Sequence, residues 1–451
     1  MIKVAAPALP ADEVLRRVSR GARPFLLDGA QCGAQGSAQG GAQGGDGLGR
    51  YSFAGCDPDD GLVWRRGDAG EPFRLLEDAQ RRWSTGPVDD EWPIAVGYVT
   101  YDAAAHELAR LHGRTLAAVD DLDLPGVDFA RYRAVWRYDR QRDVAEILAH
   151  DSAAAEQLLG RLRRTPLPLV SLAPATLVPL WSKVDYEKRV ERILEYLRCG
   201  DAYQVNLAQR LVARVSDESA LALYLALRRV APAPLGAFLA TDAGTIVSNS
   251  PEQLLRVETR KVDGRYAVYA LSRPIKGTRP RGSVDADDAA QVRALLDSEK
   301  DAAEHLMIVD LVRNDLGKVG AIGSVTASAR RVLALPTVNH LVSTVEARVE
   351  RGTADLLASM LPGGSVTGAP KLAAVQIIDQ LEGVARGVYC GALGWLGAGR
   401  ALHLSLPIRT GVVKRGELVL PVGGGIVADS TPDGEWAETH VKARAFVTAL
   451  S

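Results

Sequence analysis

Two acidic pairs have a spacing that places each pair on one face of a predicted helix. Asp301 and Glu304 are three positions apart, as are Glu435 and Glu438, and Lys442 follows on the same face as the second pair. Carboxylates without histidine or cysteine partners suit Mg²⁺, which takes one or two of them and completes its shell with substrate and water. The alternative is two solvated helix faces. The apolar run HLMIVDLV after Glu304 favours a buried helix and therefore a magnesium site.

Glycine-rich loops are the second feature that could carry chemistry. The segment PGGSVTGAPK at 362–371 leads into a predicted helix, and free backbone N–H groups at a helix start bind anions. Its lysine is not placed as in a nucleotide-binding P-loop. A second glycine loop at 423–425 precedes the Glu435 pair, and Arg409 at a predicted strand end suits a carboxylate. Each loop alone could be a tight turn, but together these features indicate a small dianionic substrate.

Lys276 lies in the segment RPIKGT, on a turn constrained by a proline and a glycine. A lysine that is buried, or that has a cationic neighbour such as Arg273, gives up its proton more readily and becomes a nucleophile. The alternative is a lysine in a salt bridge. Glu252 follows a predicted strand end and could donate or accept a proton, or be a surface carboxylate. His340 lies in a strand pattern that is more typical of a hydrogen-bonded core residue than of a catalyst.

The elements that must position these residues predict an α+β fold with large antiparallel sheets. The apolar spacing from 183 onward predicts a helix that ends at Gly200 and leads into a strand at 203–207. Strands outnumber helices and do not alternate strictly with them, which argues against a doubly wound sheet. Further strands are predicted at 244–248, 265–271, 341–349, 388–396 and 401–413, and helices at 287–316, 370–382 and 433–449.

The chain divides by composition into two parts. Residues 1–150 contain short strand-like segments, and residues 183–451 hold all the candidate chemistry. A proline-rich stretch within 151–182 is typical of a linker. The Gly/Ala/Gln-rich stretch at 29–49 cannot bury enough apolar surface to offset the ordering entropy of its glycines, so we predict a disordered insertion.

Composition excludes several classes of protein. The 451 residues carry 54 basic and 55 acidic side chains, which gives no overall field for nucleic acid or an anionic membrane. Four widely spaced cysteines indicate a reducing compartment rather than a disulfide scaffold. No signal peptide or membrane-spanning run is recognisable. We therefore expect a cytoplasmic protein with no nucleic-acid or membrane partner.

These motifs resemble the chorismate-utilising enzymes, which include the first components of anthranilate synthase and aminodeoxychorismate synthase, and the isochorismate and salicylate synthases. The resemblance covers nearly all of 183–451, and the N-terminal part is similar but looser. It implies the fold of that family, with antiparallel sheets packed as a sandwich and flanked by helices. The motifs are GDAYQVNLAQR, SNSPEQLL, RPIKGTRPR, KDAAEHLMIVDLVRND, HLVSTVEARV, PGGSVTGAPK, VYCGALGW, SLPIRT and GGGIVADSTPDGEWAETHVKA.

Single positions resemble the aminodeoxychorismate synthase branch. That branch has a lysine in PIKGT, as at Lys276, whereas anthranilate synthases typically have alanine there. The isochorismate and salicylate branch has a water-activating lysine at the position of Gln204. The segments PGGSVTG and YQVNL also look like the aminodeoxychorismate branch. The alternatives are an anthranilate synthase component I and a catalytically silent regulatory homologue, although the four carboxylates are all present.

The resemblance implies a mechanism and a set of site residues. Mg²⁺, held by Glu304 and Glu438 with Asp301 and Glu435 in support, would bind the ring carboxylate of chorismate. Lys276 would add at C2 as the C4 hydroxyl leaves, and ammonia from a separate glutaminase subunit would then add at C4 and expel the lysine. Glu252 would be the general acid, and His340 would lie near the C4 hydroxyl. The residues implied in substrate binding are Thr278, Ser365, Val366, Thr367, Gly368, Tyr389, Arg409, Gly425 and Lys442.

The N-terminal part contains one departure from the family pattern. Related synthases bind tryptophan in a pocket that carries the motif LLES, whereas this chain has Leu27 and Asp28 followed by glycine. We expect a regulatory pocket here whose response to tryptophan is in doubt.

Overall fold

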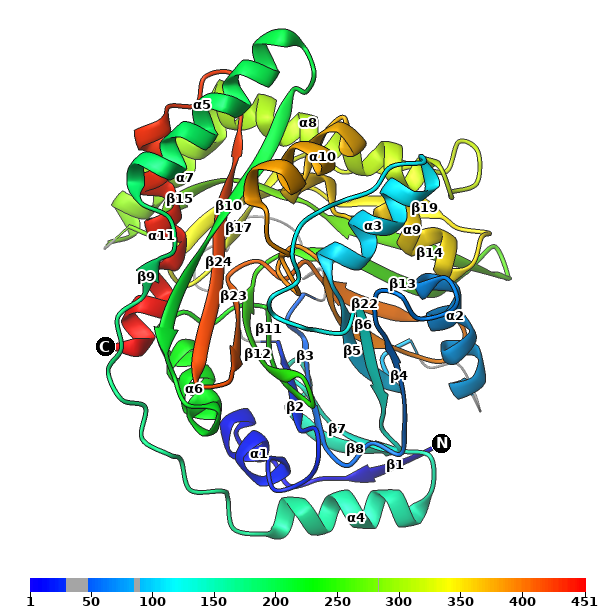
Figure 1. Cartoon of the computed structure of the whole chain (residues 1–451). Helices are drawn as coiled ribbons and strands as arrows, with labels where there is room; N and C mark the ends of the chain where they lie inside the picture. Colours follow the sequence, from blue (N-terminus) through cyan, green and yellow to red (C-terminus); the bar gives the residue numbers. More distant parts are fainter. Residues whose placement is uncertain (30–47, 85–89, 283) are drawn as a thin grey trace.

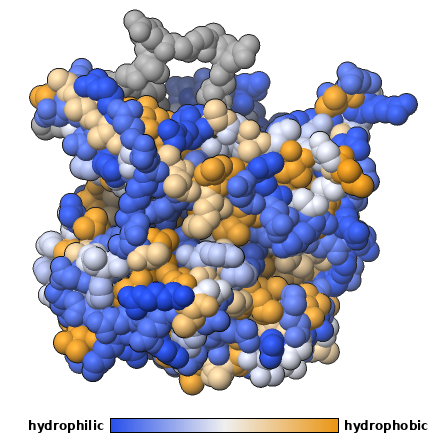
Figure 2. Space-filling model, turned by 90° about the horizontal axis from the view of Figure 1, so that it is seen from above, coloured by the Kyte–Doolittle hydropathy of each residue, from blue (hydrophilic) through white to orange (hydrophobic). Residues whose placement is uncertain are grey.

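The computed structural model describes residues 1–29, 48–84, 90–282 and 284–451 (Figure 1). The insertion predicted at 29–49 therefore lies outside the described residues, apart from its ends. Among the described residues no helix is both long and apolar enough to cross a membrane. The face seen in Figure 2 carries mostly hydrophilic side chains, with apolar ones in separate groups among them.

Three sheets, all with antiparallel pairing, form the framework. The largest has twelve strands in the order β1 (Ile2–Ala5), β8 (Val144–Ala149), β7 (Ala134–Asp139), β3 (Tyr51–Gly55), β2 (Phe25–Asp28), β11 (Leu235–Thr241), β12 (Gly244–Ser250), β23 (Thr410–Lys414), β24 (Glu417–Ile426), β10 (Gln204–Arg214) and β20 (Gly368–Ala369), with β9 (Val178–Pro179) beside β10. The second has nine in the order β16 (Thr326–Ala327), β19 (Val345–Arg348), β14 (Arg265–Arg273), β13 (Gln253–Val262), β22 (Leu402–Ser405), β21 (Ala392–Leu396), β5 (Ala95–Val99), β6 (Val127–Arg131) and β4 (Asp60–Trp64). The third comprises β15 (Ile275–Pro280), β18 (Val338–Val342) and β17 (Arg331–Ala334).

Helices surround the sheets on the outside of the molecule (Figure 1). They are α1 (Ala11–Val18), α2 (Pro72–Trp83), α3 (Tyr101–Leu111), α4 (Ser152–Arg163), α5 (Lys183–Cys199), α6 (Ala220–Val230), α7 (Asp285–Asp297), α8 (Glu299–Gly317), α9 (Thr353–Met360), α10 (Lys371–Glu382) and α11 (Pro432–Leu450).

The two large sheets pack face to face. One core cluster joins Phe25 and Ile246 of the first sheet to Tyr98 and Trp395 of the second. A second cluster packs α1, α4, α6 and α11 on the outer face of the first sheet. A third buries the outer face of the second sheet under helices that include α2, α3 and α8. The predicted α+β sandwich flanked by helices is therefore confirmed.

Both large sheets take strands from before and after the predicted linker. In the first sheet β2 pairs with β11, and in the second β5 pairs with β21. Between α4 and β9 the chain follows an irregular path along the outside (Figure 1). The division into 1–150 and 183–451 is thus a division of the sequence, while in space the two parts share their sheets.

Several predicted elements are confirmed and others need correction. The helix that ends at Gly200 is α5, and Gly200 adopts the left-handed conformation that glycine favours. The prediction of one helix over 287–316 is wrong, because Ser298 interrupts it and caps α8 by accepting from the N–H of Asp301. The segments 341–349 and 401–413 each contain two strands rather than one.

Candidate active site

Lys276 on β15 lies at the centre of the predicted site residues. Its Nζ is 3.1 Å from Glu304 Oε2 on α8, an element that packs against β15. Its charge also acts on the carboxyls of Glu252, Glu435 and Glu438. The fold therefore brings residues from three other motifs around the amine of Lys276.

The carboxylates of α8 and α11 face this amine with different partners. Asp301 accepts from Arg279 at 2.7 Å, and Glu438 pairs with Lys442 at 2.7 Å. Burial raises the pKa of Glu435, and the nearby charge of Glu438 raises it further. For Glu438 burial acts in the same direction, but the charges of Lys442, Lys276 and Lys300 together outweigh it and the pKa is lowered. Glu438 is therefore held as an anion.

The acidic residues have the donor chemistry of a magnesium site. Glu435 Oε1 accepts from Ser430 at 2.6 Å, whereas its Oε2 is buried and no hydrogen-bond partner for it lies in the part of the chain that the structure describes. An unpaired buried carboxylate oxygen is costly unless a cation or water meets it. Within the described residues no three acidic, histidine or cysteine side chains are grouped tightly enough to hold a metal by themselves. A cation with only one or two protein ligands, and substrate or water as the others, fits this arrangement.

Glu252 lies in the turn between β12 and β13 and is 5% exposed. Burial raises the pKa of its carboxyl to about 7, although Ser365, the N–H of Ile275 and the charges of Lys276 and Arg409 oppose the shift. Ser365 Oγ donates to Glu252 Oε1 at 3.0 Å. The alternative of a surface-turn carboxylate is therefore wrong. A carboxyl with this pKa can donate or accept a proton at neutral pH.

His340 on β18 is also buried and points one nitrogen at β15. Its Nδ1 lies 3.0 Å from Thr278 Oγ1 and 3.2 Å from the carbonyl oxygen of Gly277. Because a carbonyl can only accept, Nδ1 carries the proton and Nε2 is left as an acceptor. Burial, together with the charge of Arg409, lowers the pKa of His340 to about 3, so the ring is neutral. Nε2 is buried without a partner among the described residues.

The anion loop, Gly363–Gly368, lies between α9 and α10. It contains the turn Gly364–Val366, and Gly368 continues into β20, which pairs with β10. Ser365 connects the loop to Glu252, as described above. Lys371, however, points away from the loop: its Nζ donates to Asp315 Oδ2 at 2.7 Å and to the carbonyl of Ser359 at 3.1 Å. This lysine therefore secures the start of α10 and does not close an anion site.

The remaining predicted substrate-binding residues lie at strand ends and in β24. Arg409, which is half-buried and has a positive φ of 52°, precedes β23, and its charge acts on Glu252 and His340. Tyr389 is 5% exposed and precedes β21. In β24 the Cβ of an alanine at position 425 would lie 3.1 Å from the amide carbon of Gln204. Gln204 is fully buried, and neither its oxygen nor its nitrogen has a partner among the described residues.

Arg386 and Asp102 are not among the predicted site residues. Arg386 is buried beside Tyr389, with its guanidinium carbon 5.9 Å from the ring centre. Asp102 on α3 accepts from the backbone N–H groups of Arg386 and Gly387. The sequence signal that could have indicated Arg386 is its place as a single arginine in an otherwise apolar and glycine-rich stretch. Nothing local marks Asp102, because its partners are distant in sequence.

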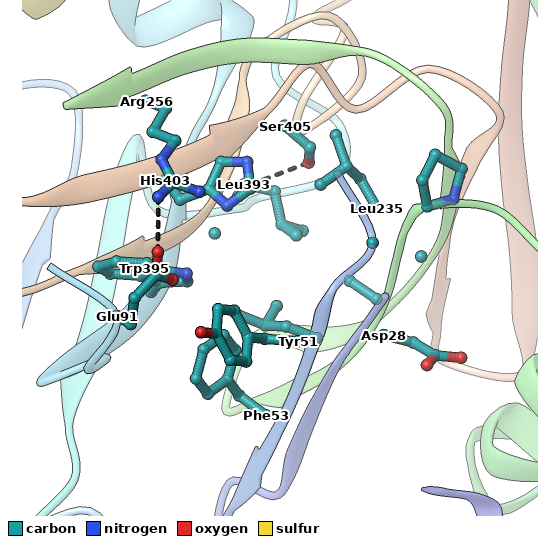
Figure 3. A pocket seen from close by; sticks show the side chains of 16 residues that line it. Asp28, Tyr51, Phe53, Glu91, Leu235, Arg256, Leu393, Trp395, His403 and Ser405 are labelled. Carbon is teal, nitrogen blue, oxygen red and sulfur yellow. Dashed lines mark hydrogen bonds and ion pairs between the residues drawn. The ribbon is translucent and has the colours of Figure 1, made fainter. Parts of the chain in front are cut away.

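Leu27 and Asp28 line a separate cavity between the two large sheets, together with Tyr51, Trp395 and His403. Figure 3 shows the carboxylate of Asp28 turned away from the ring of Tyr51. That carboxylate accepts from Ser52 Oγ at 2.9 Å and from Arg140 Nη2 at 3.0 Å, and it is also paired with Arg228. Asp28 thus already has its partners, and a regulatory role for the cavity remains a prediction.

Comparison with known proteins identifies the family. A family model described as chorismate binding enzyme matches residues 47–448. The chain is 32% identical to aminodeoxychorismate synthase component 1 of Bacillus subtilis over 434 residues, 89% of each chain. It is 39% identical to anthranilate synthase component 1 of Thermus thermophilus over 371 residues, 79% of this chain and 78% of the relative.

A solved structure agrees with this assignment. The anthranilate synthase component I of Streptococcus pneumoniae superposes with a TM-score of 0.75 and 27% identity, covering 92% of this chain and 95% of that one. The menaquinone-specific isochorismate synthase of Escherichia coli has the same fold at 19% identity and a TM-score of 0.75. With the sandwich and the clustered motifs on both sides of Lys276, these matches show that the chain belongs to the chorismate-binding enzyme family.

Proposed function

We propose that this chain is the chorismate-aminating component of an aminodeoxychorismate synthase, which makes 4-amino-4-deoxychorismate for 4-aminobenzoate and folate synthesis. The observation that carries the proposal is the place of Lys276. Its amine lies among Glu252, Glu304 and Glu438, where a nucleophile could reach a substrate held by the anion loop and the acidic helices.

Lys276 and Glu252 have different roles in the substitution of the C4 hydroxyl by ammonia. The amine of Lys276 forms a bond to C2 while the ring double bond shifts and the C4–O bond breaks. Glu252, whose carboxyl stays partly protonated at neutral pH, gives its proton to the departing hydroxyl to form water. Ammonia then bonds to C4, the double bond returns, and the C2–N bond to Lys276 breaks. Covalent addition in this way divides one difficult step into two easier ones.

The amine must be uncharged before it can attack carbon. In the structure it is ion-paired with Glu304. Mg²⁺, with Glu304 and Glu438 as ligands and Asp301 and Glu435 in support, would neutralise the ring carboxylate of chorismate. Glu304 cannot serve a cation and Lys276 equally, so we expect the ion pair to loosen when the site is loaded.

Other residues hold the substrate and the second nucleophile. Arg409, Tyr389 and the anion loop suit the enolpyruvyl carboxylate, and Thr278 and Lys442 lie toward the ring. His340 can accept from the C4 hydroxyl through Nε2. The unpaired amide of Gln204, beside Gly425, can hydrogen-bond ammonia. Ammonia would come from a separate glutaminase subunit, in keeping with the name component 1 of the relatives.

A second candidate function is anthranilate synthase component I, which the 39% identity to the Thermus thermophilus relative favours. Incubation with chorismate, Mg²⁺ and ammonium distinguishes the two. We expect a non-fluorescent amino product that yields 4-aminobenzoate only after a lyase is added. Fluorescent anthranilate without any lyase would contradict the proposal. Unconsumed chorismate would instead indicate a silent homologue.

A further inference from the structure

Arg386 connects the anion loop to two other elements through its guanidinium. Its side chain is 2% exposed. Nε and Nη2 donate to the two carboxylate oxygens of Glu382, at 2.8 and 2.6 Å, and Nη1 donates to the carbonyl of Val366 at 2.9 Å. Nη2 also donates to the carbonyl of Asn206 at 3.0 Å. One side chain therefore joins α10, the loop and β10.

The main chain of Arg386 is fixed as well as its side chain. Asp102 Oδ1 accepts from the N–H of Arg386 at 3.0 Å, and Oδ2 accepts from the N–H of Gly387 at 2.7 Å. Glu382 in turn accepts from the N–H of Ala208 at 2.8 Å. Both ends of the arginine are thus anchored, so the guanidinium has little freedom to follow a loop that moves.

These contacts determine how the loop presents its backbone. Arg386 holds the carbonyl of Val366, and the N–H of Asn206 holds the carbonyl of Thr367 at 2.8 Å. Because each peptide unit is planar, a fixed carbonyl also fixes the direction of the next N–H group. Arg386 therefore sets the direction of the Thr367 N–H, which donates to the carbonyl of Gly364 at 3.3 Å and so shapes the turn. Asn206 sets the direction of the Gly368 N–H.

A lysine could not reproduce this arrangement. The planar guanidinium makes its bonds to Glu382 as a fork and reaches two carbonyls at the same time. Its carbon also lies 4.6 Å from the ring centre of Tyr101 and 5.9 Å from that of Tyr389, a predicted substrate-binding residue. Arg386 therefore supports both parts of the site that face the enolpyruvyl carboxylate.

We infer that Arg386 is a positioning residue for chorismate, which sets the anion loop and Tyr389 for the substrate without touching it. The inference rests on the proposed function in taking chorismate as the substrate and the anion loop and Tyr389 as its contacts. In the proposed mechanism ammonia does not bind the anion loop, so the loss of Arg386 should affect the binding of chorismate but not that of ammonia.

Steady-state consumption of chorismate by the full chain, with Mg²⁺ and ammonium, tests this role in the variant Arg386→Lys. We expect the KM for chorismate to rise about tenfold, as for a lost charge-assisted hydrogen bond, while the KM for ammonium stays within about twofold. The control is Arg23→Lys, which alters another largely buried arginine–carboxylate pair, with Asp128, and leaves the loop alone. It should keep the wild-type KM for chorismate.

A second variant keeps the inference testable if Arg386→Lys does not fold. Glu382→Gln keeps Arg386 but weakens the two hydrogen bonds that it makes to residue 382. This variant should also raise the KM for chorismate, by less than Arg386→Lys does. A wild-type KM for chorismate in the folded variants, with only kcat reduced, would overturn the inference, since lost structure alone lowers the amount of active enzyme. The product formed by the wild type is read separately. If that product is anthranilate, the proposed function fails while the KM values still decide the role of Arg386.

Discussion

Glu252 is the residue whose chemistry depends most on its burial. In water a glutamic acid is ionised at neutral pH and cannot serve as an acid. Here burial raises the pKa of Glu252 to about 7, while Ser365 and the N–H of Ile275 hold the carboxyl in place. The fold thus holds a proton donor for neutral pH close enough to Lys276 for the two charges to interact.

Substitution of Glu252 by glutamine should remove this acid without changing the shape of the site. We expect kcat/KM to fall by about a hundredfold or more. The wild type should lose activity as the pH rises through about 7, because the donor is then ionised, and the variant should lack this limb. A pH profile of kcat/KM measures both effects, with Glu191→Gln on the exposed face of α5 as the control. An unchanged alkaline limb in Glu252→Gln would contradict the assignment.

The same group makes a prediction about stability. The folded pKa of Glu252 is higher than the unfolded one, so folding binds a proton more tightly. The stabilisation is complete below about pH 4.5 and is lost as the pH rises toward 7, by about 3 kcal/mol. The free energy of unfolding can be measured in urea at pH 5 and pH 8 for the wild type and for Glu252→Gln. The value for the wild type minus that for the variant should be smaller at pH 8 than at pH 5. A difference that grew with pH would show that the carboxylate is stabilised instead.

Substitutions of Lys276 can separate the effect of its charge from that of its nucleophilic amine. Lys276→Arg keeps a cation able to pair with Glu304, but a guanidinium stays protonated and cannot attack carbon. We expect both Lys276→Arg and Lys276→Ala to lose amination with ammonium. Mass spectrometry of the wild type with chorismate should detect an adduct on Lys276 that neither variant forms. Normal turnover by Lys276→Arg would limit the lysine to an electrostatic role.

Single residues were predictable where their types and spacing are local. The acidic pairs, Lys276 and Glu252 could be identified because each lies in a short motif with a recognisable chemistry. Arg386 and Asp102 could not, because their meaning depends on partners far away in the chain. Lys371 was misleading, since its position after a glycine loop suggests an anion site while its amine pairs with Asp315.

The junction of β24 with α11 is the element on which the acidic site depends. Gly424 on β24 lies so close to α11 that the Cβ of an alanine would be 2.7 Å from Glu435 Oε2. The helix N-cap Thr431 and the bond from Ser430 to Glu435 fix the first turn of α11 against this strand. The absent side chain at position 424 therefore leaves space for the carboxylate.

Gly424→Ala should displace Glu435 and weaken metal support. We expect the Mg²⁺ concentration for half-maximal activity to rise about tenfold, as for the loss of an outer-shell partner. Titration of activity with Mg²⁺ measures this shift. Gly160→Ala on α4, where the added Cβ meets nothing within 4 Å, is the matched control. A lower kcat with an unchanged Mg²⁺ requirement would separate Glu435 from the metal.

Element boundaries were predictable only in part. Apolar spacing and the stop at Gly200 gave α5 correctly, because both signals are local. The break between α7 and α8 depends on a serine cap inside a continuous helical pattern. The gap between β22 and β23 contains Arg409 with its positive φ, a conformation that no sequence pattern indicates. Tertiary contacts decide such interruptions.

At the scale of the whole molecule, the fold class could be predicted but the strand order could not. Many strands without strict alternation with helices indicate antiparallel sheets. The order in which β2 joins β11, and β5 joins β21, requires pairing between residues more than two hundred positions apart. Such pairings leave no local signal, so the sequence shows two parts where the structure has shared sheets.

Cleavage between the two parts should therefore leave the molecule intact. A protease site inserted after Val170, where Leu169 and Val170 are 44% and 45% exposed, opens the chain between α4 and β9. Several interactions join the two sides of the cut. They are the β2–β11 and β5–β21 ladders, the bonds of Asp102 to the N–H groups of Arg386 and Gly387, and the ion pair of Arg210 with Asp121. We expect the cleaved protein to elute as one species, keep its activity and unfold in a single transition. If the fragments eluted separately in native buffer and the C-terminal one were active, residues 183–451 would fold alone and the expectation would be wrong. Because the two parts share sheets, we expect the fragments to separate only in denaturant.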